Sequence, residues 1–379
     1  MTSRRLPAIL IAAALTVGAC GAAATPTPAP TQAPTTAPSG AATEAPTQEP
    51  DGTLPAPEKT SVNLGTGIGE ISQYTAVLAE ELGFYEKYGL KVEITRFNSG
   101  GDALQALLAG QLDVAANGGA DMPIKTQIAG SPVQVISIFK SHIFDGIFCR
   151  SEIKTPEDAK GKIWAVSTLG SSPHASILVA LPLLGLTSSD IVIQQVGGNS
   201  VRLAALKAGS VDCIPASVED TKLLLDLGFN ELIDISKQEE ARYPAPSLMA
   251  TPEFIAANPN TVLVLAAAQL EAQQVLINDQ KTSAEHWAAF AQVDMAEAEA
   301  KAKVVPGFLD PCMMWKDEWM GFPREVLALT APEVANADLP STGDHSFLQK
   351  LVEIGFYKKI GAPDTLGPSC EPKPLDLGV

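Results

Sequence analysis

Basic side chains are scarce in this sequence. Its 379 residues include 26 Lys and Arg against 43 Asp and Glu, which gives a formal net charge of −17 at pH 7. Proteins bind nucleic acid mainly by neutralising phosphates with clustered Lys and Arg, so a nucleic-acid partner is not expected. The acidic excess otherwise indicates only a soluble surface and identifies no ligand.

The usual motifs of metal, redox and nucleotide chemistry are also missing. No C-x-x-C occurs, which argues against a zinc ribbon or a thioredoxin site. No phosphate-binding loop occurs either, because Gly161-Lys162 is followed by Ile163. The four histidines are scattered and do not converge with carboxylates in the sequence: His142, His174, His286 and His345. We therefore expect no catalytic centre, no metal site and no cofactor.

The apolar run at the N-terminus is too short for a lasting membrane span. Arg4 and Arg5 precede an apolar stretch over residues 6–17, and Val17-Gly18-Ala19 leads into Cys20. This order is typical of a secretory signal, and the small residues before Cys20 resemble a bacterial lipobox. We expect a lipoprotein signal peptide over 1–19 and lipidation of Cys20, which would place the protein on the extracytoplasmic face of the cell membrane. The alternative is an ordinary signal peptide with an incidental cysteine.

Residues 20–58 are rich in Ala, Pro and Thr and poor in large apolar side chains. Such a stretch cannot bury enough apolar surface to offset the entropy lost on ordering. Its prolines favour extended, semi-stiff geometry. We expect a disordered tether behind the lipid anchor.

Four cysteines follow the tether, and an even number in an exported protein suggests disulfides. Three connectivities are possible, and spacing alone does not choose among them. The pairing that we favour joins Cys149 to Cys213 within one lobe and Cys312 to Cys370 at the C-terminal tail.

From residue 60 the chain alternates strand-like and helix-like segments, and one unit occurs twice. The segment "GGDALQALLAGQLDVAANGG" is followed 99 residues later by "GNSVRLAALKAGSVDCIPAS", and Asp113 falls on Asp212. Each copy predicts a helix that stops at a glycine and turns into a strand, with the aspartate accepting backbone N–H groups in the turn. The residues after the two strands differ, as expected if those strand ends contact different parts of a ligand.

The two βαβαβ series predict an α/β protein with two lobes, each a mostly parallel sheet flanked by helices. We expect the chain to cross between the lobes near 140–147 and near 243–250. This gives lobe 1 as 59–145 and 246–379, and lobe 2 as 146–245, joined by a two-strand hinge. The helical segments after residue 250 are expected to pack mainly on lobe 1.

Several segments, in this order, resemble one known family. They are "LAEELGFYEKYGLKVEI", "SGGDALQALLAGQLDVAANGGAD", "AGSPVQVIS", "TPEDAKGKIWAVSTLGSSPH" and "ALKAGSVDCIPAS", which span roughly residues 60–360. They are similar to the substrate-binding proteins of ABC importers for nitrate, sulfonates, taurine, thiamine pyrimidines and riboflavin. The resemblance implies a type II periplasmic-binding-protein fold and a monomeric receptor that delivers a small solute to a permease. The ATPase would be a separate chain.

Ligands of open α/β sheets bind beyond the carboxyl ends of the strands, often against helix N-termini. That rule selects four groups of loops as the candidate cleft, although Ser171 or Ser172 could instead only cap a helix. The ligand-binding residues expected on these loops are Glu70, Gln73, Tyr74, Asn98, Ser99, Asn117, Thr168, Ser171, Ser172, His174, Ser217 and Glu219.

The candidate loops contain neither Arg nor Lys, and an oxyanion would favour such residues or well-aimed helix N-termini. On that ground we expect a nitrogen heterocycle such as riboflavin or a thiamine pyrimidine. A sulfonate, taurine or nitrate receptor is the alternative. Two alternatives of another class are an enzyme similar to thiamine-pyrimidine synthases, which would need a Lys and clustered Cys in the cleft, and a receptor coupled to a sensor protein.

Overall fold

The structure is a computed structural model, and the parts of it described here belong to one compact unit, Glu49–Val379. The expected signal peptide, the lipidation site at Cys20 and residues 20–49 of the expected tether lie outside the described residues. The end of the expected tether, residues 50–58, is attached to the C-terminal helices, because Gly52 N–H donates to the carbonyl oxygen of Ile354 at 2.7 Å and Glu58 accepts from the backbone N–H of Thr261 at 2.9 Å. Those residues are 50–67, 71, 74–169, 171–238, 242–329, 331–336 and 342–373.

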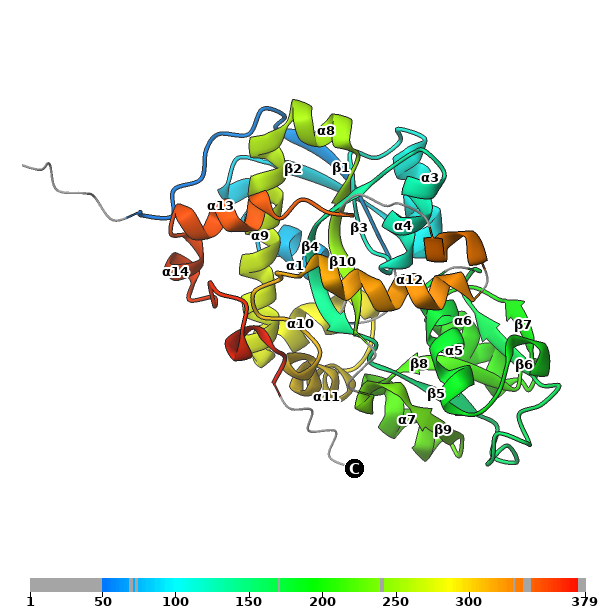
Figure 1. Ribbon diagram of the computed structural model, residues 1–379. Helices are drawn as coiled ribbons and strands as arrows, with labels where there is room; N and C mark the ends of the chain where they lie inside the picture. The colour runs from blue at the N-terminus through cyan, green and yellow to red at the C-terminus, as the bar shows by residue number, and fades with distance from the viewer. Residues whose placement is uncertain are drawn as a thin grey trace, which may run out of the picture. The chain divides into compact units, whose positions relative to one another are not determined.

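Two five-stranded sheets form the framework (Figure 1). The first has the order β2-β1-β3-β10-β4 and the second β7-β6-β8-β5-β9. The strands of the first sheet are β1 (Ser61–Gly67), β2 (Lys91–Phe97), β3 (Val114–Ala116), β4 (Gln134–His142) and β10 (Arg242–Ala250). Those of the second are β5 (Asp145–Cys149), β6 (Ile163–Val166), β7 (Val192–Gln195), β8 (Cys213–Ser217) and β9 (Asn230–Asp234).

Each sheet is mostly parallel, as expected, and carries its one antiparallel strand in the same place. In the first sheet β10 runs antiparallel to β3 and β4, and in the second β5 runs antiparallel to β8 and β9. Each of these two strands directly follows a crossover from the other sheet: β5 follows β4, and β10 follows β9. The two sheets thus have the same topology, and in each one the strand that follows the crossover takes the fourth place in the strand order.

The crossovers lie at residues 143–144 and between β9 and β10. The first agrees with the expected position. The second lies earlier than 243–250, because β10 already begins at Arg242 and pairs with β4 there. The expected boundary between residues 245 and 246 therefore falls inside a strand of the first sheet, and we assign residues 242–245 to lobe 1.

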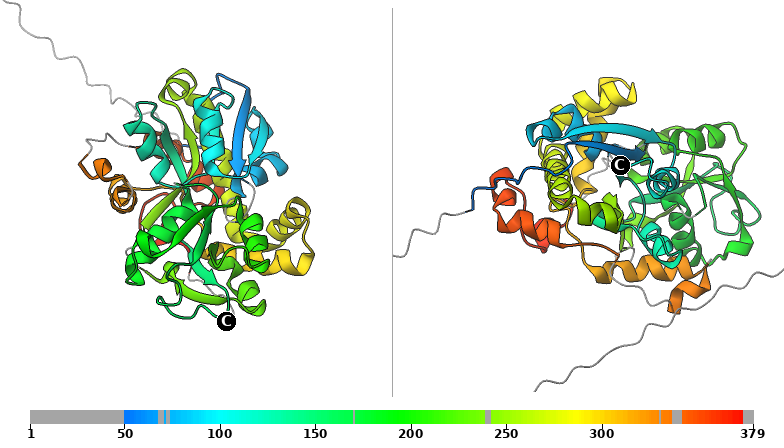
Figure 2. Two further views of the ribbon diagram at one scale, coloured as in Figure 1. Left: turned by 90° about the vertical axis from the view of Figure 1, so that its right-hand side faces the viewer. Right: turned by 90° about the horizontal axis from the view of Figure 1, so that it is seen from above.

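Helices cover both sheets (Figure 2). Lobe 2 contains α5 (Ser172–Leu183), α6 (Asn199–Lys207) and α7 (Thr221–Asp226) with its second sheet. Lobe 1 contains the first sheet, the helices before β5 and those after β10. They are α1 (Thr75–Glu81), α2 (Phe84–Lys87), α3 (Gly100–Leu108), α4 (Asp121–Ile128), α8 (Pro252–Ala257), α9 (Pro259–Asn278), α10 (Gln280–Ala291), α11 (Met295–Val304), α12 (Gly321–Ala328), α13 (Ser346–Glu353) and α14 (Phe356–Ile360).

The repeated helix-turn-strand unit has the same backbone hydrogen bonds in both lobes. Helices α3 and α6 are each followed by a left-handed glycine, Gly110 (φ 71°) and Gly209 (φ 70°), whose conformation costs a residue without a Cβ little. Asp113 Oδ2 then accepts a hydrogen bond from the backbone N–H of Asn63 in β1, at 2.9 Å. Asp212 Oδ2 likewise accepts from the backbone N–H of Ile163 in β6, so both aspartates accept backbone N–H groups as predicted, although the donors lie in a neighbouring strand instead of in the turn.

The sequence over residues 71–89 reads as a single helix that stops at Gly89, but its described residues form two helices. Helix α1 ends at Glu81 and α2 begins at Phe84, because Gly83 between them adopts φ 70°. The helical pattern of the sequence over residues 283–305 is likewise divided between α10 and α11, with a break at Gln292, whose φ is 56°.

The C-terminal helices pack mainly on lobe 1, with α12 as a bridge to lobe 2. The long helix α9 is buried along most of its length and contacts α1 and α2. Helix α12 contacts α4 and β10 of lobe 1 and also α5 of lobe 2. Its Val326 and Leu327 belong to an apolar cluster that includes side chains of both lobes. Among the described residues, no helix combines the length and apolar character that crossing a membrane requires.

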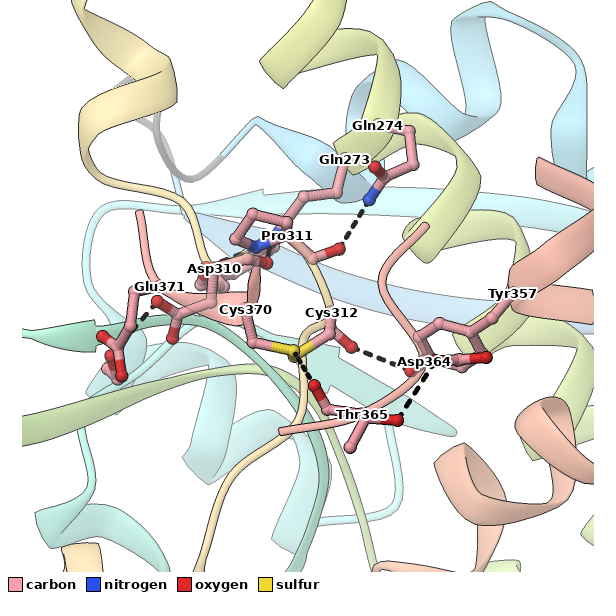
Figure 3. Close-up of a disulfide and its surroundings, with 12 residues drawn as sticks. Gln273, Gln274, Asp310, Pro311, Cys312, Tyr357, Asp364, Thr365, Cys370 and Glu371 are labelled. Carbon is pink, nitrogen blue, oxygen red and sulfur yellow. Dashed lines mark hydrogen bonds between the residues drawn. A yellow bond between two sulfur atoms is a disulfide. The ribbon is translucent and has the colours of Figure 1, made fainter. Parts of the chain in front are cut away.

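Two disulfides are present, and they are the pairs favoured from the sequence: Cys149–Cys213 and Cys312–Cys370. The first joins facing residues of β5 and β8. The second attaches the C-terminal tail to the loop after α11 (Figure 3). Around it, Tyr357 Oη donates to the carbonyl oxygen of Cys312 at 2.8 Å, so the loop that carries Cys312 is held to α14.

Candidate functional site

A cavity of about 90 Å³ lies between the two lobes. Its walls come from the carboxyl ends of strands, the starts of helices and the first crossover. Its polar lining residues are Asn98, Ser99, Asn117, Lys140, His142, Asp145, Ser167, Ser171, Ser172, Ser176, Asn199, Arg202 and Tyr243.

Three helices begin at this cavity. Ser99 caps α3, with its Oγ accepting from the backbone N–H of Asp102 at 3.1 Å. Ser171 precedes α5 but makes no cap bond, because its Oγ donates to the carbonyl oxygen of Thr168 at 2.7 Å. Gly198 precedes α6. The N–H groups and positive dipole ends of three helices therefore meet at one place, which favours negative charge there.

Two buried cations also line the cavity. Lys140 lies on β4 and is 7% exposed, and Arg202 lies on α6 and is 3% exposed. The Arg202 guanidinium is held by hydrogen bonds to the carbonyl oxygen of Gly197 at 3.2 Å and to Asn199 Oδ1 at 3.3 Å. A planar guanidinium held in this way matches oxyanions in geometry as well as in charge.

A histidine and a carboxylate complete the polar lining near the first crossover. Burial, and next the nearby Arg242, lower the pKa of His142 to about 4, so its imidazole is neutral near pH 7. Its Nδ1 lies 3.0 Å from Ser141 Oγ. Asp145 Oδ2 accepts a hydrogen bond from Ser176 Oγ on α5. The lining thus contains positively charged groups, hydroxyls, a neutral imidazole and the carboxylate of Asp145.

The lobes touch around the cavity at positions where one partner has no side chain. A Cβ on Gly198 of lobe 2 would lie 3.2 Å from the backbone oxygen of Asn98 in lobe 1. A Cβ on Gly119 of lobe 1 would lie 3.0 Å from Ser172 Oγ of lobe 2. Such close approaches correspond to a closed arrangement of the two lobes.

Five of the residues expected at the site do line the cavity: Asn98, Ser99, Asn117, Ser171 and Ser172. They come from both lobes and from the strand ends and helix starts on which the expectation rested. Of the remaining expected residues, Glu70 and Gln73 lie outside the described residues.

The other five expected residues have different surroundings. Tyr74 is 2% exposed and packs in the core, with its ring centroid 5.4 Å from that of Trp287. Its hydroxyl donates to Glu81 at the end of α1. Thr168 faces Gly101 at the contact between the lobes, where a Cβ on that glycine would be 3.3 Å from Thr168 Oγ1.

His174, Ser217 and Glu219 also fall outside the cavity lining. His174 lines a neighbouring hollow of about 360 Å³ beside α12, together with Asp121 and Lys125. Ser217 is 1% exposed at the end of β8, where it pairs with Asp145. The negative charge of Glu219 helps to raise the pKa of Lys301 in lobe 1.

Sequence reasoning missed Lys140 and Arg202 because it searched loops for cations, whereas these two lie on a strand and inside a helix. A signal for Arg202 does exist in the repeat. The 99-residue offset that aligns Asp113 with Asp212 aligns Ala103 with Arg202, and Ala103 is completely buried. An arginine at the position of a buried alanine indicates a buried charge that needs a function.

The residues that the structure describes contain no group of three or more His, Cys, Asp or Glu side chains able to hold a metal ion.

Comparison with known proteins agrees with this geometry. The sequence model of the NMT1/THI5-like family matches residues 72–283, more than half of the chain. A putative binding protein of Brucella abortus is 25% identical over 252 residues, which are 64% of this chain and 76% of that protein.

Solved structures agree in fold. A protein of Bordetella bronchiseptica RB50 superposes with a TM-score of 0.68 at 25% identity, covering 78% of this chain and 98% of its own. The alkanesulfonate-binding protein of Xanthomonas axonopodis pv. citri, bound to MOPS, gives a TM-score of 0.61 at 20% identity, with coverage of 77% and 98%. The Brucella and Xanthomonas proteins are both named as binding proteins, in keeping with a chain that is not an enzyme. The chain is a two-lobed protein of the periplasmic-binding-protein fold and belongs to the NMT1/THI5-like family.

Proposed function

We propose that this protein is the solute-binding receptor of an ABC importer and that its solute is a small anion of the sulfonate, taurine or nitrate kind. The observation that carries the choice of solute is the pair of buried cations, Lys140 and Arg202, in one interlobe cavity. Both side chains bring positive charge to the place where three helix N-termini meet, and an anionic group bound there would interact favourably with all of them.

The size of the cavity supports the same choice. At about 90 Å³ it is far smaller than the roughly 300–1,000 Å³ of pockets that hold drug-sized ligands. The case for riboflavin or a thiamine pyrimidine rested on a cleft without cations, and Lys140 and Arg202 remove that premise. Asp145 adds a feature that favours taurine among these solutes, because taurine carries an ammonium group besides its sulfonate and the Asp145 carboxylate can accept a hydrogen bond from that ammonium.

Delivery of the solute would follow from closure. A solute that contacts both lobes favours the closed arrangement, and a permease that binds only this arrangement would receive loaded receptor. We propose further that lipidation of Cys20 keeps a monomeric receptor at the extracytoplasmic membrane face and that the ATPase is a separate chain. Loss of labelled palmitate incorporation in a Cys20→Ser variant would test the anchor, and co-purification with a permease instead of a sensor would test the partner.

The solute is tested by thermal unfolding with ethanesulfonate, taurine, nitrate, sulfate, riboflavin and a thiamine pyrimidine. A ligand at a hundredfold excess over its Kd stabilises by about 2.7 kcal/mol. We expect stabilisation by a small anion, its loss in an Arg202→Gln variant, and no loss in Lys207→Gln, a change to an exposed cation of the same helix. Stabilisation by riboflavin or the pyrimidine alone would overturn the choice of an anion.

A further inference from the structure

A partly buried ion pair joins the lobes on the side of α11. Lys301 Nζ of α11 in lobe 1 lies 2.6 Å from Asp220 Oδ1 of lobe 2. The two side chains are 14% and 8% exposed. Burial lowers the pKa of Lys301, but Glu219 and Asp220 outweigh it and raise the pKa above its ordinary value. The ammonium group is therefore charged in this contact.

Asn199 links this ion pair to Arg202, which lines the cavity. The other carboxylate oxygen of the pair, Asp220 Oδ2, accepts a hydrogen bond from Asn199 Nδ2 at 3.2 Å. The opposite end of that amide, Asn199 Oδ1, accepts from Arg202 Nη2 at 3.3 Å. Because the amide uses its donor for Asp220 and its acceptor for Arg202, its orientation is fixed by both neighbours.

These contacts form a chain from one lobe to the ligand cavity in the other. Lys301 belongs to lobe 1, whereas Asp220, Asn199 and Arg202 belong to lobe 2, and the last two line the cavity. The first link joins the two lobes in the closed arrangement that the structure shows. Without Lys301, the buried Asp220 carboxylate would lose its cation, and Asn199 links this carboxylate to the Arg202 guanidinium.

We propose that Lys301 is a positioning residue for solute binding, which neutralises Asp220 on closure and so leaves Arg202 aimed into the cavity. The proposal rests on the proposed function in taking Arg202 as a ligand-binding group. By reciprocity, an anion that holds Arg202 in the cavity favours the Lys301–Asp220 contact and hence the closed receptor. Lys301 does not touch the solute.

The first experiment measures the affinity for ethanesulfonate by calorimetry. Lys301→Met should weaken binding about tenfold, within the usual range of coupling between sites. Lys301→Arg keeps the charge and should stay close to the wild type. Lys303→Met, an exposed lysine two residues away on the same helix, is the matched control and should also stay close to it. Equal affinities for Lys301→Met and Lys303→Met would overturn the proposal.

A double-mutant cycle separates positioning of Arg202 from closure alone. In an Arg202→Gln background, Lys301→Met should change ethanesulfonate affinity by about twofold or less, because the group it positions is absent. A tenfold loss that persists in that background would show that Lys301 acts without Arg202, which contradicts the proposal.

A measurement without solute keeps the two proposals distinguishable. Hydrogen exchange of the unliganded protein should be faster at the start of α6, residues 199–203, in Lys301→Met than in Lys303→Met. Failure of the wild type to bind any anion would reject the proposed solute class and leave this exchange test in force. Identical exchange in both variants would reject the positioning role.

Discussion

Asp212 accepts a hydrogen bond from the backbone N–H of Ile163 across a distance of 2.9 Å. It thereby fastens the turn after α6 to the first strand of the parallel group in lobe 2. Asp113 does the same for Asn63 in lobe 1, and each aspartate is also approached by a cation, Arg150 or Lys59. In both copies of the repeat, the aspartate thus attaches the turn to a neighbouring strand by a hydrogen bond, independently of which residues each lobe contributes to the cavity.

We expect Asp212→Ala to lower the free energy of unfolding by about 1–3 kcal/mol, because it leaves the Ile163 amide without its acceptor. Chemical denaturation measures this change. Asp226→Ala is the control, since Asp226 only forms an exposed ion pair with Lys222 and should change stability by about 0.5 kcal/mol or less. Equal effects of the two substitutions would contradict the fastening role.

Gly198→Ala tests the closed arrangement. The added Cβ would meet the backbone oxygen of Asn98 in the other lobe at 3.2 Å, and the glycine has φ −61°, which alanine adopts readily. We expect weaker solute binding, with the unfolding temperature of the free protein changed little.

Gly321→Ala serves as the control for that substitution, because nothing lies within 4 Å of its Cβ and its φ is also −61°. Small-angle X-ray scattering of the free and solute-bound forms would show whether the radius of gyration of Gly198→Ala stays larger than that of the wild type. A variant that binds and compacts as the wild type does would contradict the closed contact.

His142 predicts a pH dependence of stability. Its pKa is about 4 in the folded protein against 6.5 ordinarily, so the folded state binds fewer protons than the unfolded state between these values. Its contribution to stability is therefore complete above pH 6.5 and is lost as the pH falls toward 4. Denaturation at several pH values should show a smaller loss over this window in His142→Gln, and an unchanged slope would contradict the assignment.

The tail disulfide is expected to matter for stability. Cys312 and Cys370 are 58 residues apart, and closing a loop of that length stabilises by about 4 kcal/mol in the chain-entropy description. The bond also lies next to Glu371, which pairs with Arg242 at the start of β10 at 2.9 Å.

Cys370→Ser should therefore lower the unfolding temperature and loosen the contact of the tail with β10. Exchange of the amides around residue 242 would report the second effect. An unfolding temperature equal to that of Glu371→Gln would indicate that only the ion pair matters.

Local rules were sufficient for the parts of this protein that depend on near neighbours. The glycine stops at Gly110 and Gly209 and the alternation of strands and helices follow from residues a few positions apart. The helix break at Gly83 shows the limit, because a glycine inside an apolar pattern is compatible with either one helix or two.

The site was predicted less well, since it depends on which side chains meet across the two lobes. Ser99 and Ser171 were found because strand ends and helix starts define the cavity edge. Tyr74 was misplaced because its position in the loop did not reveal that its ring turns into the core beside Trp287. Lys140 joins the site only through the register of β4, which no local pattern specifies.

The position of β10 has a consequence for the order in which the chain matures. Strands β5 to β9 are contiguous, so the second sheet has all its strands once residue 234 has been synthesised. The first sheet has a vacant place between β3 and β4 until residues 242–250 arrive. In vectorial synthesis or export the half that begins the chain is consequently the half that is finished last.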